Sequence, residues 1–377
     1  MRFLHLADLH LGKRVNEFSM IEDQRYVLKQ VLNTIEQYHI QSVLMAGDIY
    51  DKSVPSAEAV LLLNDFLTKL SQKGIQTFVI SGNHDSAERI GFGADIMSQA
   101  GIYMAKPYGG IVEKVTVEDE FGEIDIYLLP FVKPATVRHF CKEEEIQTYD
   151  EAVAAVMRQT EPDKAKRNIL VAHQYVRGAV RCDSENMSIG GIDEVSVENF
   201  KDFDYVALGH LHGPQHVQSE NIRYAGTLLK YSFSEVRHHK CALIVDMGKK
   251  GDIRYEKVDI RPLHDMKELK GTYYELTSKC FYEGLDRKDY YHMTLTDEED
   301  VIHALELLRT IYPNIMKLDY DNQRTRQNKE VMLTQNIEEK SPVDLFEEFY
   351  EMQNNLPMTE EQREIVQELA DKIWEVE

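Results

Sequence analysis

The stretch from Val43 to Asp51, VLMAGDIYD, decides the fold of this 377-residue chain. Four residues that suit a buried strand lead into Gly47, and Asp48 follows where the strand should end. A carboxylate at the mouth of an apolar strand is costly unless a positive charge pairs with it. We therefore expect metal ions at the end of this strand, with Asp48 between them.

Four further apolar runs of strand length end in the same way. Residues 2–7, 77–82, 168–172 and 205–209 lead into Asp8, Asn83, His173 and His210. Apolar residues at helical spacing lie between the runs, for example in residues 21–38 and 55–70, which gives an α/β pattern. Because ligands in α/β sheets gather outside the carboxyl ends of the strands, five such endings predict one shared site.

The candidate ligands are oxygen and nitrogen donors. They are Asp8, His10, Asp48, Asn83, His173, His210 and His212. Taken singly, each residue could have a structural role, for example as a buried histidine whose hydrogen bonds are all made. The appearance of all seven in this order, each after a strand, argues against a purely structural role. A mixed N/O set suits Mn²⁺, Fe²⁺ or Zn²⁺ better than Ca²⁺. Seven ligands are too many for one ion, but they fit two ions that share a carboxylate and act on a phosphoester.

Five motifs resemble a known enzyme family. ADLH, GDIYD, GNHD, AHQ and GHLH, in that order, are similar to the motifs of the calcineurin-like metallophosphoesterases. More narrowly, HLADLHLGKR, SGNHDS, GHLHGPQ and YAGTLLKYSFSE resemble the SbcD family of nuclease subunits of bacterial SbcCD complexes. The resemblance covers residues 1–260 closely and the remainder by layout.

The resemblance implies an α/β fold. Residues 1–262 would form a four-layer α/β/β/α metallophosphoesterase sandwich. A small α+β capping domain with a polar linker would follow over residues 263–340. Within that stretch we expect a linker over 263–271 and a strand just after Thr272. Residues 341–377 would form a helical tail.

The resemblance also implies a dinuclear centre, with Mn²⁺ as the expected metal. One ion would be held by Asp8, His10, Asp48 and His212. The other would be held by Asp48, Asn83, His173 and His210. His84 would protonate the leaving oxygen, Asp51 would orient His84, and metal-activated water would attack phosphorus without a protein nucleophile.

Three functions fit such a centre. The resemblance implies a DNA nuclease, a double-strand exonuclease and single-strand or hairpin endonuclease that serves repair and recombination. A phosphatase with the same metals is the second possibility, but Lys52 and Ser53 stand where phosphatases of this superfamily commonly carry an arginine. A scaffold with structural metals is the third, and the presence of His84 argues against it.

Charge bears on how DNA would be held. The candidate contacts are Lys13, Arg14, Arg89, Arg177 and Arg181, although each singly is as consistent with a solvated surface charge. A net charge of −22 argues against tight DNA binding by bulk charge. We expect help from a partner, which the resemblance identifies as the SbcC-type SMC-like ATPase, and weak, salt-sensitive cleavage by the isolated chain.

Several segments indicate contacts with other chains and the cellular setting. Helices near 55–72 and 86–99, the second interrupted by glycines, indicate either buried core or a homodimer face. The acidic tail, with 11 acidic and two basic residues, either packs on its own body or, as we favour, docks the ATPase. Charges and histidines within MRFLHLADLHLGKR argue against a signal peptide, and no run suits a membrane span, so we expect a cytoplasmic chain with reduced cysteines.

Overall fold

The computed structural model describes residues 1–142, 145–182, 185, 194–299, 301–323 and 325, and scattered positions between 343 and 369. The chain forms two compact units. The first comprises Met1–Glu268 with Lys288–Tyr291, and the second comprises Leu269–Arg287 with His292–Glu377. Among the described residues, no helix has both the length and the apolar character that a membrane crossing requires.

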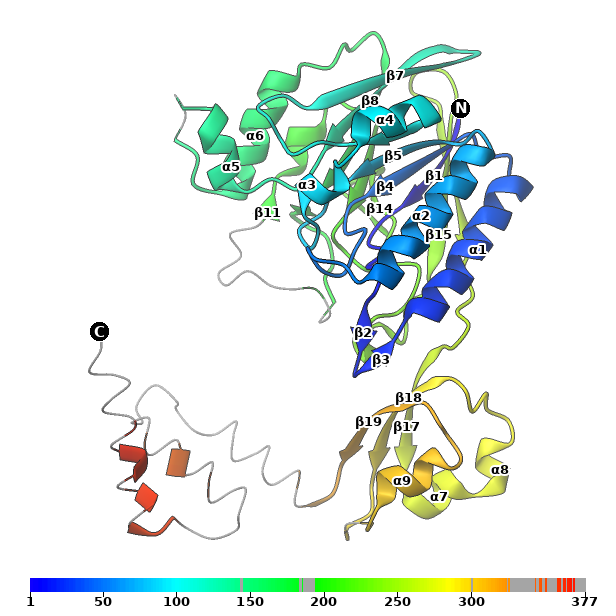
Figure 1. Cartoon of the computed structure of the whole chain (residues 1–377), viewed down its shortest axis with the longest axis vertical. Helices are drawn as coiled ribbons and strands as arrows, with labels where there is room; N and C mark the ends of the chain where they lie inside the picture. The colour runs from blue at the N-terminus through cyan, green and yellow to red at the C-terminus, as the bar shows by residue number, and fades with distance from the viewer. Residues whose placement is uncertain are drawn as a thin grey trace. The chain divides into compact units, whose positions relative to one another are not determined.

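Two six-stranded sheets form the first unit (Figure 1). In spatial order, the first sheet contains β16 (Ile253–Asp259), β15 (Cys241–Met247), β1 (Arg2–Leu6), β4 (Ser42–Ala46), β5 (Gln76–Ile80) and β6 (Ile102–Met104). The second contains β13 (Gln215–Val217), β14 (Ser219–Tyr224), β12 (Tyr205–Gly209), β9 (Arg167–His173), β8 (Gly122–Leu129) and β7 (Glu113–Asp119).

Helices cover the outer faces of both sheets. The first sheet carries α1 (Ile21–Gln37) and α2 (Ala57–Gln72), and the second carries α5 (Pro134–Phe140) and α6 (Tyr149–Thr160) (Figure 1). Between the sheets, alternate residues of the strands, such as Phe3, Leu44 and Ile169, form one apolar core. The arrangement confirms the predicted four-layer α/β/β/α sandwich.

The central strands of both sheets run parallel and end at one edge. In the first sheet β1 pairs with β4 and β4 with β5, and in the second β9 pairs with β12. Strands β4, β9 and β12 are buried along their whole length, as strands covered on both faces should be. All five candidate strand endings therefore meet at the carboxyl edge of the sandwich.

The order of the strands in the sheets does not follow their order in the chain. Strand β15 comes after β14 in the sequence, but it pairs with β1 and continues the first sheet. The chain therefore crosses from the second sheet to the first after β14. The general preference of consecutive strands to pair with each other does not predict this crossing.

Residues 86–99 form α3 (Ala87–Ile90), α4 (Ala94–Met97) and η1 (Ser98–Ala100), which agrees with an interrupted helix.

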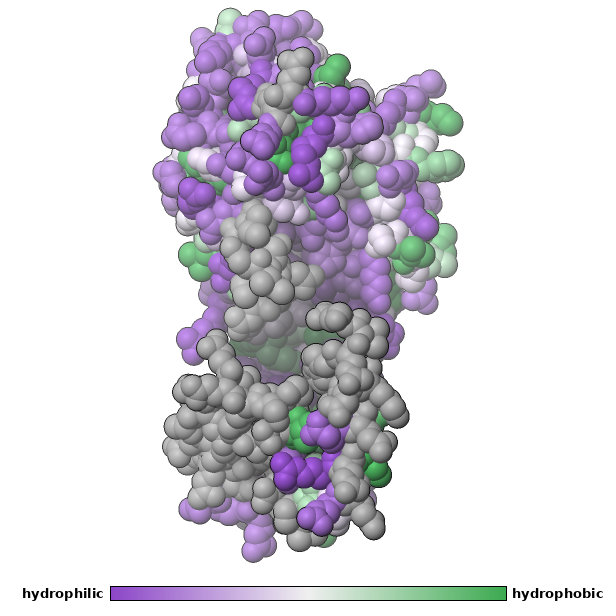
Figure 2. All heavy atoms as spheres, turned by 90° about the vertical axis from the view of Figure 1, so that its left-hand side faces the viewer, coloured by the Kyte–Doolittle hydropathy of each residue, from purple (hydrophilic) through white to green (hydrophobic). Residues whose placement is uncertain are grey.

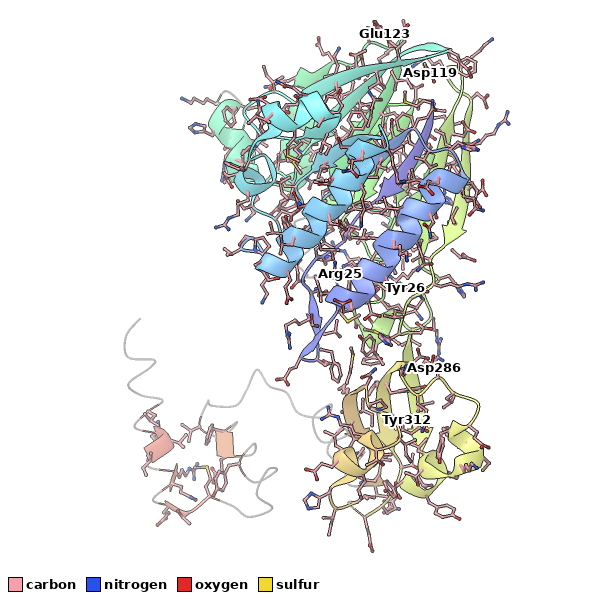
Figure 3. The ribbon with its side chains drawn as sticks, turned by 45° about the vertical axis from the view of Figure 1, so that its right-hand side comes forward. Arg25, Tyr26, Asp119, Glu123, Asp286 and Tyr312 are labelled. Atoms are coloured by element: carbon pink, nitrogen blue, oxygen red, sulfur yellow. The ribbon has the colours of Figure 1, made fainter. Side chains whose placement is uncertain are left out.

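The second unit contains most of a three-stranded sheet in the order β17 (Met266–Gly271), β18 (Tyr290–Leu295) and β19 (Ile315–Tyr320). Its helices are α7 (Tyr273–Thr277), α8 (Lys279–Tyr282) and α9 (Ala304–Arg309). The expected linker before Gly271 is thus partly a strand, and the expected strand after Thr272 is a helix, because Thr272 and Glu275 form a capping box. Tyr312, labelled in Figure 3, anchors this unit by donating to the carbonyl oxygen of Leu276 at 2.8 Å.

Short elements join these layers in the first unit. They are β2 (Arg14–Val15), β3 (Phe18–Ser19), β10 (Tyr175–Val176), β11 (Glu194–Val195), η2 (Val197–Phe200) and η3 (Phe233–Glu235). At the sheet end opposite the ligand-bearing edge, Asp119 in the β7–β8 hairpin pairs with Arg167 at 2.5 Å (Figure 3). The face shown in Figure 2 is mostly hydrophilic where its residues are coloured.

Candidate metal centre

Most of the predicted ligands lie on turns just after their strands, and His173 is the last residue of β9. Asp8, His10, Asp48 and His210 hold positive φ angles of 52°, 44°, 48° and 106°. These backbone conformations are uncommon for residues other than glycine, and they cluster at functional sites. Gly82 allows the close approach of two such turns, because a Cβ there would lie 2.1 Å from Oδ1 of Asp48.

Asp48 lies at the centre of the cluster. Its Oδ2 is 3.4 Å from Nε2 of His173 and 3.7 Å from Nε2 of His10, while its Oδ1 accepts the main-chain N–H of His84 at 2.9 Å. Burial alone would raise the pKa of Asp48, but the charge and hydrogen bond of the neighbouring His173 outweigh burial and hold this pKa well below its usual range. The carboxylate is therefore charged and lies between the two groups of ligands.

One group of ligands has its donor atoms at the spacing of a metal shell. Oδ1 of Asn83 is 3.0 Å from Nε2 of His173 and 2.9 Å from Nδ1 of His210. Neighbouring ligands on an octahedral ion with bonds of ~2.1 Å lie about 3 Å apart. Nδ1 of His173 donates to the carbonyl oxygen of Ala46 at 2.8 Å, which leaves its Nε2 for a cation.

The second group contains the clearest sign that a metal fits. His10 is buried, and neither of its ring nitrogens has a hydrogen-bond partner among the described residues. Leaving both unsatisfied is costly unless a ligand completes the site. The His10 ring lies 5.3 Å from that of His212, and burial lowers the pKa of His10, which keeps the ring neutral and able to bind a cation.

A buried ion pair supports His212, and the sequence analysis did not identify it. Nδ1 of His212 donates to Oε1 of Glu235 at 3.0 Å, and the other oxygen of Glu235 accepts from Nζ of Lys240 at 2.5 Å. Burial opposes the charge on Glu235, but the His212 hydrogen bond and Lys240 lower its pKa well below the usual range. Glu235 is the last residue of the quoted stretch YAGTLLKYSFSE. Its position in the sequence did not indicate a contact with His212.

Further supporting residues were also missed. Oε1 of Glu185 accepts the main-chain N–H of His212 at 2.6 Å, and Glu185 lines the same small pocket as the ligands. From α1, Gln24 donates to the carbonyl oxygen of His10 at 2.8 Å and to the hydroxyl of Tyr231 at 3.0 Å. These bonds fix the turns that carry the histidines.

His84 and Asp51 lie beside the ligands. Nδ1 of His84 donates to the main-chain carbonyl of Asp51 at 3.0 Å. The carboxylate of Asp51 instead pairs with Nζ of Lys13 at 2.7 Å. Asp85 holds this loop, since its carboxylate accepts main-chain N–H groups, including those of Ile49 and Tyr50, at 3.0 and 2.9 Å.

The basic residues expected to contact DNA have different surroundings. Lys13 lines the metal pocket, while Arg14 donates to the carbonyl oxygen of Glu17 and Arg89 lies on α3. Arg177 pairs with Glu194 at 3.1 Å. The Arg181 guanidinium stacks 3.3 Å above the ring of Tyr175.

The fold and this centre agree with two family models. Residues 1–214 match the Metallophos model, described as calcineurin-like phosphoesterase. Residues 262–354 match SbcD_C, described as type 5 capsule protein repressor C-terminal domain. The chain belongs to the calcineurin-like phosphoesterase family and is a metal-dependent phosphoesterase.

Within that class, the chain belongs with the SbcD proteins of SbcCD nucleases. It is 32% identical over 322 residues to the SbcD protein of the SbcCD nuclease from Staphylococcus epidermidis, covering 84% of this chain and 85% of that protein. It is 31% identical over 355 residues to the Staphylococcus saprophyticus protein of the same name, covering 92% of each. The solved structure of a dimetal phosphatase from Danio rerio aligns with 69% of this chain and with 98% of the phosphatase chain. The sequence identity is 11% and the TM-score is 0.39, so this similarity is too distant to bear on function.

Proposed function

We propose that this chain is a Mn²⁺-dependent DNA nuclease, with double-strand exonuclease and single-strand or hairpin endonuclease activity in DNA repair and recombination. The observation that carries the proposal is the convergence of seven metal-competent side chains and His84 at one edge of the sandwich, where Asp8 and His173 group with Asp48 and the others line one pocket with it. Relatives that cover most of the chain bear the name nuclease. The mixed imidazole and oxygen donors favour Mn²⁺ over Ca²⁺.

The proposed chemistry follows from the residues present. Two ions bound by the seven ligands would activate water and offset the charge of the phosphodiester. His84 carries its proton on Nδ1, because the Asp51 carbonyl can only accept, so Nε2 is the atom that exchanges a proton with the leaving oxygen. Lys13 lines the pocket and adds positive charge for the phosphate.

The phosphatase alternative keeps the same centre and differs in substrate. A hairpin, a blunt duplex and a phenyl phosphate should be offered to the full chain with Mn²⁺ or Mg²⁺, with and without the ATPase. We expect cleavage of both DNA substrates, faster with Mn²⁺ and with the ATPase. Hydrolysis of the phenyl phosphate without any cleavage of DNA would reject the nuclease in favour of a phosphatase.

Two substitutions separate metal binding from proton transfer. His84→Ala should keep two metal ions per chain and slow DNA cleavage by about 10²–10⁴-fold, the usual contribution of a general acid. Asp48→Ala should lose both ions, because the shared carboxylate is gone. The exposed His139→Ala is the matched control and should change neither metal content nor rate. Two ions retained in Asp48→Ala would refute the bridging role.

The proposal includes partners. An SbcC-type SMC-like ATPase would dock through the acidic residues 341–377 and contribute part of the DNA grip. A second copy of the chain would dock on α2 and the α3–α4 segment, where Leu61 and Phe92 are 66% and 83% exposed. Chromosomal DNA as substrate would place the chain in the cytoplasm.

A further inference from the structure

A second hollow lies beside the metal centre, on the far side of His212. It is an open groove of about 410 Å³. The residues of its lining that matter here are Arg181, Cys182, Gly213, His238, His239 and Lys257. None of these belongs to the five motifs of the phosphoesterase family, and only Arg181 was singled out from the sequence.

The groove and the metal centre share a thin wall. Sγ of Cys182 donates to Oε1 of Glu185 at 3.2 Å, and the same oxygen accepts the main-chain N–H of His212 at 2.6 Å. Gly213 directly follows His212, and a Cβ on Gly213 would lie 3.5 Å from Cε1 of His238. A polymer whose reacting group lies at the metals therefore reaches the groove by passing His212.

The lining is basic although the whole chain carries a net charge of −22. Among the described lining residues there are two permanent cations and two histidines, and no carboxylate. Arg181 is held in place, because it stacks on Tyr175 and because Val180 and Gln215 exchange hydrogen bonds at 2.8 and 2.7 Å. A cationic surface of this kind is built for an anion and not for an apolar ligand.

Strand β16 aims Lys257 at the groove. Successive side chains of a strand point to opposite faces, so Lys257 shares a face with Tyr255. Tyr255 packs near Tyr205 of the second sheet, with ring centroids 5.9 Å apart, so this face is turned toward the second sheet. Arg254 lies on the other face of the same strand and provides a matched comparison.

Building on the nuclease function proposed above, we infer that this groove binds the backbone phosphates of the nucleic-acid strand next to the scissile bond. Arg181 and Lys257 would pair with successive phosphates, and His238 and His239 would add hydrogen bonds. Such contacts hold and orient the strand without reading its sequence. Because the groove opens beside His212, a strand cleaved at the metals would occupy it during every turnover.

The test measures binding of a fluorescent single-stranded oligonucleotide to the full chain at several salt concentrations. All proteins carry His84→Ala so that the probe survives. Each lost phosphate contact should lower the slope of log affinity against log salt by about 0.7. Lys257→Gln and Arg181→Gln should each show that loss, and the double variant should show about twice as much. Arg254→Gln should match the parent.

Activity provides the second readout, in chains that keep His84. Among the groove variants, Lys257→Gln should hydrolyse bis(p-nitrophenyl) phosphate at the parent rate, since that ester is too short to reach the groove, and this also shows that the variant folds. Their KM for DNA should rise several-fold with kcat unchanged. Unchanged salt slopes, or equal slopes for Arg254→Gln and Lys257→Gln, would overturn the groove proposal.

Two further outcomes identify the occupant of the groove and separate its role from the nuclease activity. If deleting residues 341–377 abolishes the effect of the groove substitutions, the occupant is the chain's own acidic tail and not DNA. If the parent binds the oligonucleotide but never cleaves DNA, the nuclease proposal fails, while the salt slopes still decide whether the groove holds phosphates.

Discussion

His5 in β1 and His10 in the turn after it are both buried, yet their ring nitrogens have opposite surroundings. Nε2 of His5 donates to the carbonyl oxygen of Leu208 at 3.1 Å, and Nδ1 accepts from the hydroxyl of Tyr205 at 2.9 Å. Burial lowers the pKa of His5 to about 3, so it joins the two sheets as a neutral ring. His10 has no such partners among the described residues, which fits the metal-ligand role proposed for it.

Glu235 offers a test at this scale. Glu235→Gln preserves the hydrogen bond to His212 but removes the negative charge that makes its ring a stronger ligand. We expect the affinity for Mn²⁺ to fall about 10–100-fold, measured by calorimetric titration of the metal-free chain. Glu220→Gln, at an exposed carboxylate, is the control. Equal affinities for the two variants would show that Glu235 serves folding alone.

The seven candidate ligands could be singled out at residue scale because each lies at or a few residues past the end of a strand, so that local spacing places it. The supporting residues could not be predicted, because their approach to the centre depends on tertiary packing and not on local spacing. They are Glu185, Glu235 and Lys240. Asp51 shows an intermediate case. Its proximity to His84 was expected, but the contact is made by its carbonyl oxygen, while its carboxylate pairs with Lys13.

At the scale of elements, α2 carries apolar residues on two faces. Leu62, Leu63 and Phe66 are buried against the first sheet, whereas Leu61 is 66% exposed. The sequence predicted the helix well, because Ser56 caps it and its apolar residues repeat at helical spacing. The sequence could not decide whether Leu61 lies in the buried core or in a homodimer interface, because three consecutive leucines are more than one helix face needs.

If α2 forms part of a homodimer interface, Leu61→Glu should shift the chain from dimer to monomer at micromolar concentration. Its folding stability should change little, since the side chain is mostly exposed. Molecular mass by analytical ultracentrifugation is the measurement. Ile111→Glu, at an 82% exposed residue before β7, is the matched control and should leave the mass unchanged. A dimer that survives Leu61→Glu would exclude this face.

At the scale of the whole molecule, long-range connections limited what the sequence revealed. The sandwich follows from strands and helices that alternate in order, but the return of β15 to β1 joins residues about 240 positions apart. In the second unit, the polar strand β17 gave no apolar signal. The predicted tail helices lie largely outside the described residues, and Trp374 is among the undescribed positions.

The tail also concentrates charge, since its 11 acidic and two basic residues account for nine of the 22 net negative charges. If it docks the ATPase, deletion of residues 341–377 should abolish co-purification of the two chains. Mn²⁺-dependent cleavage of short substrates should persist, because every ligand lies before Gly213. Co-purification at the parent level after the deletion would refute docking through the tail.

The left-handed backbone conformation at His10 and His210 determines how substitutions at these two positions would change the stability of the chain. An L-residue in that conformation costs about 1 kcal/mol or more, and glycine at the same place would relieve it. In a chain that no longer needed to bind metal ions, substitutions that replaced these histidines with glycine would thus raise its thermal stability. A chain that keeps both histidines therefore gives up thermal stability at two positions where metal ligands are proposed.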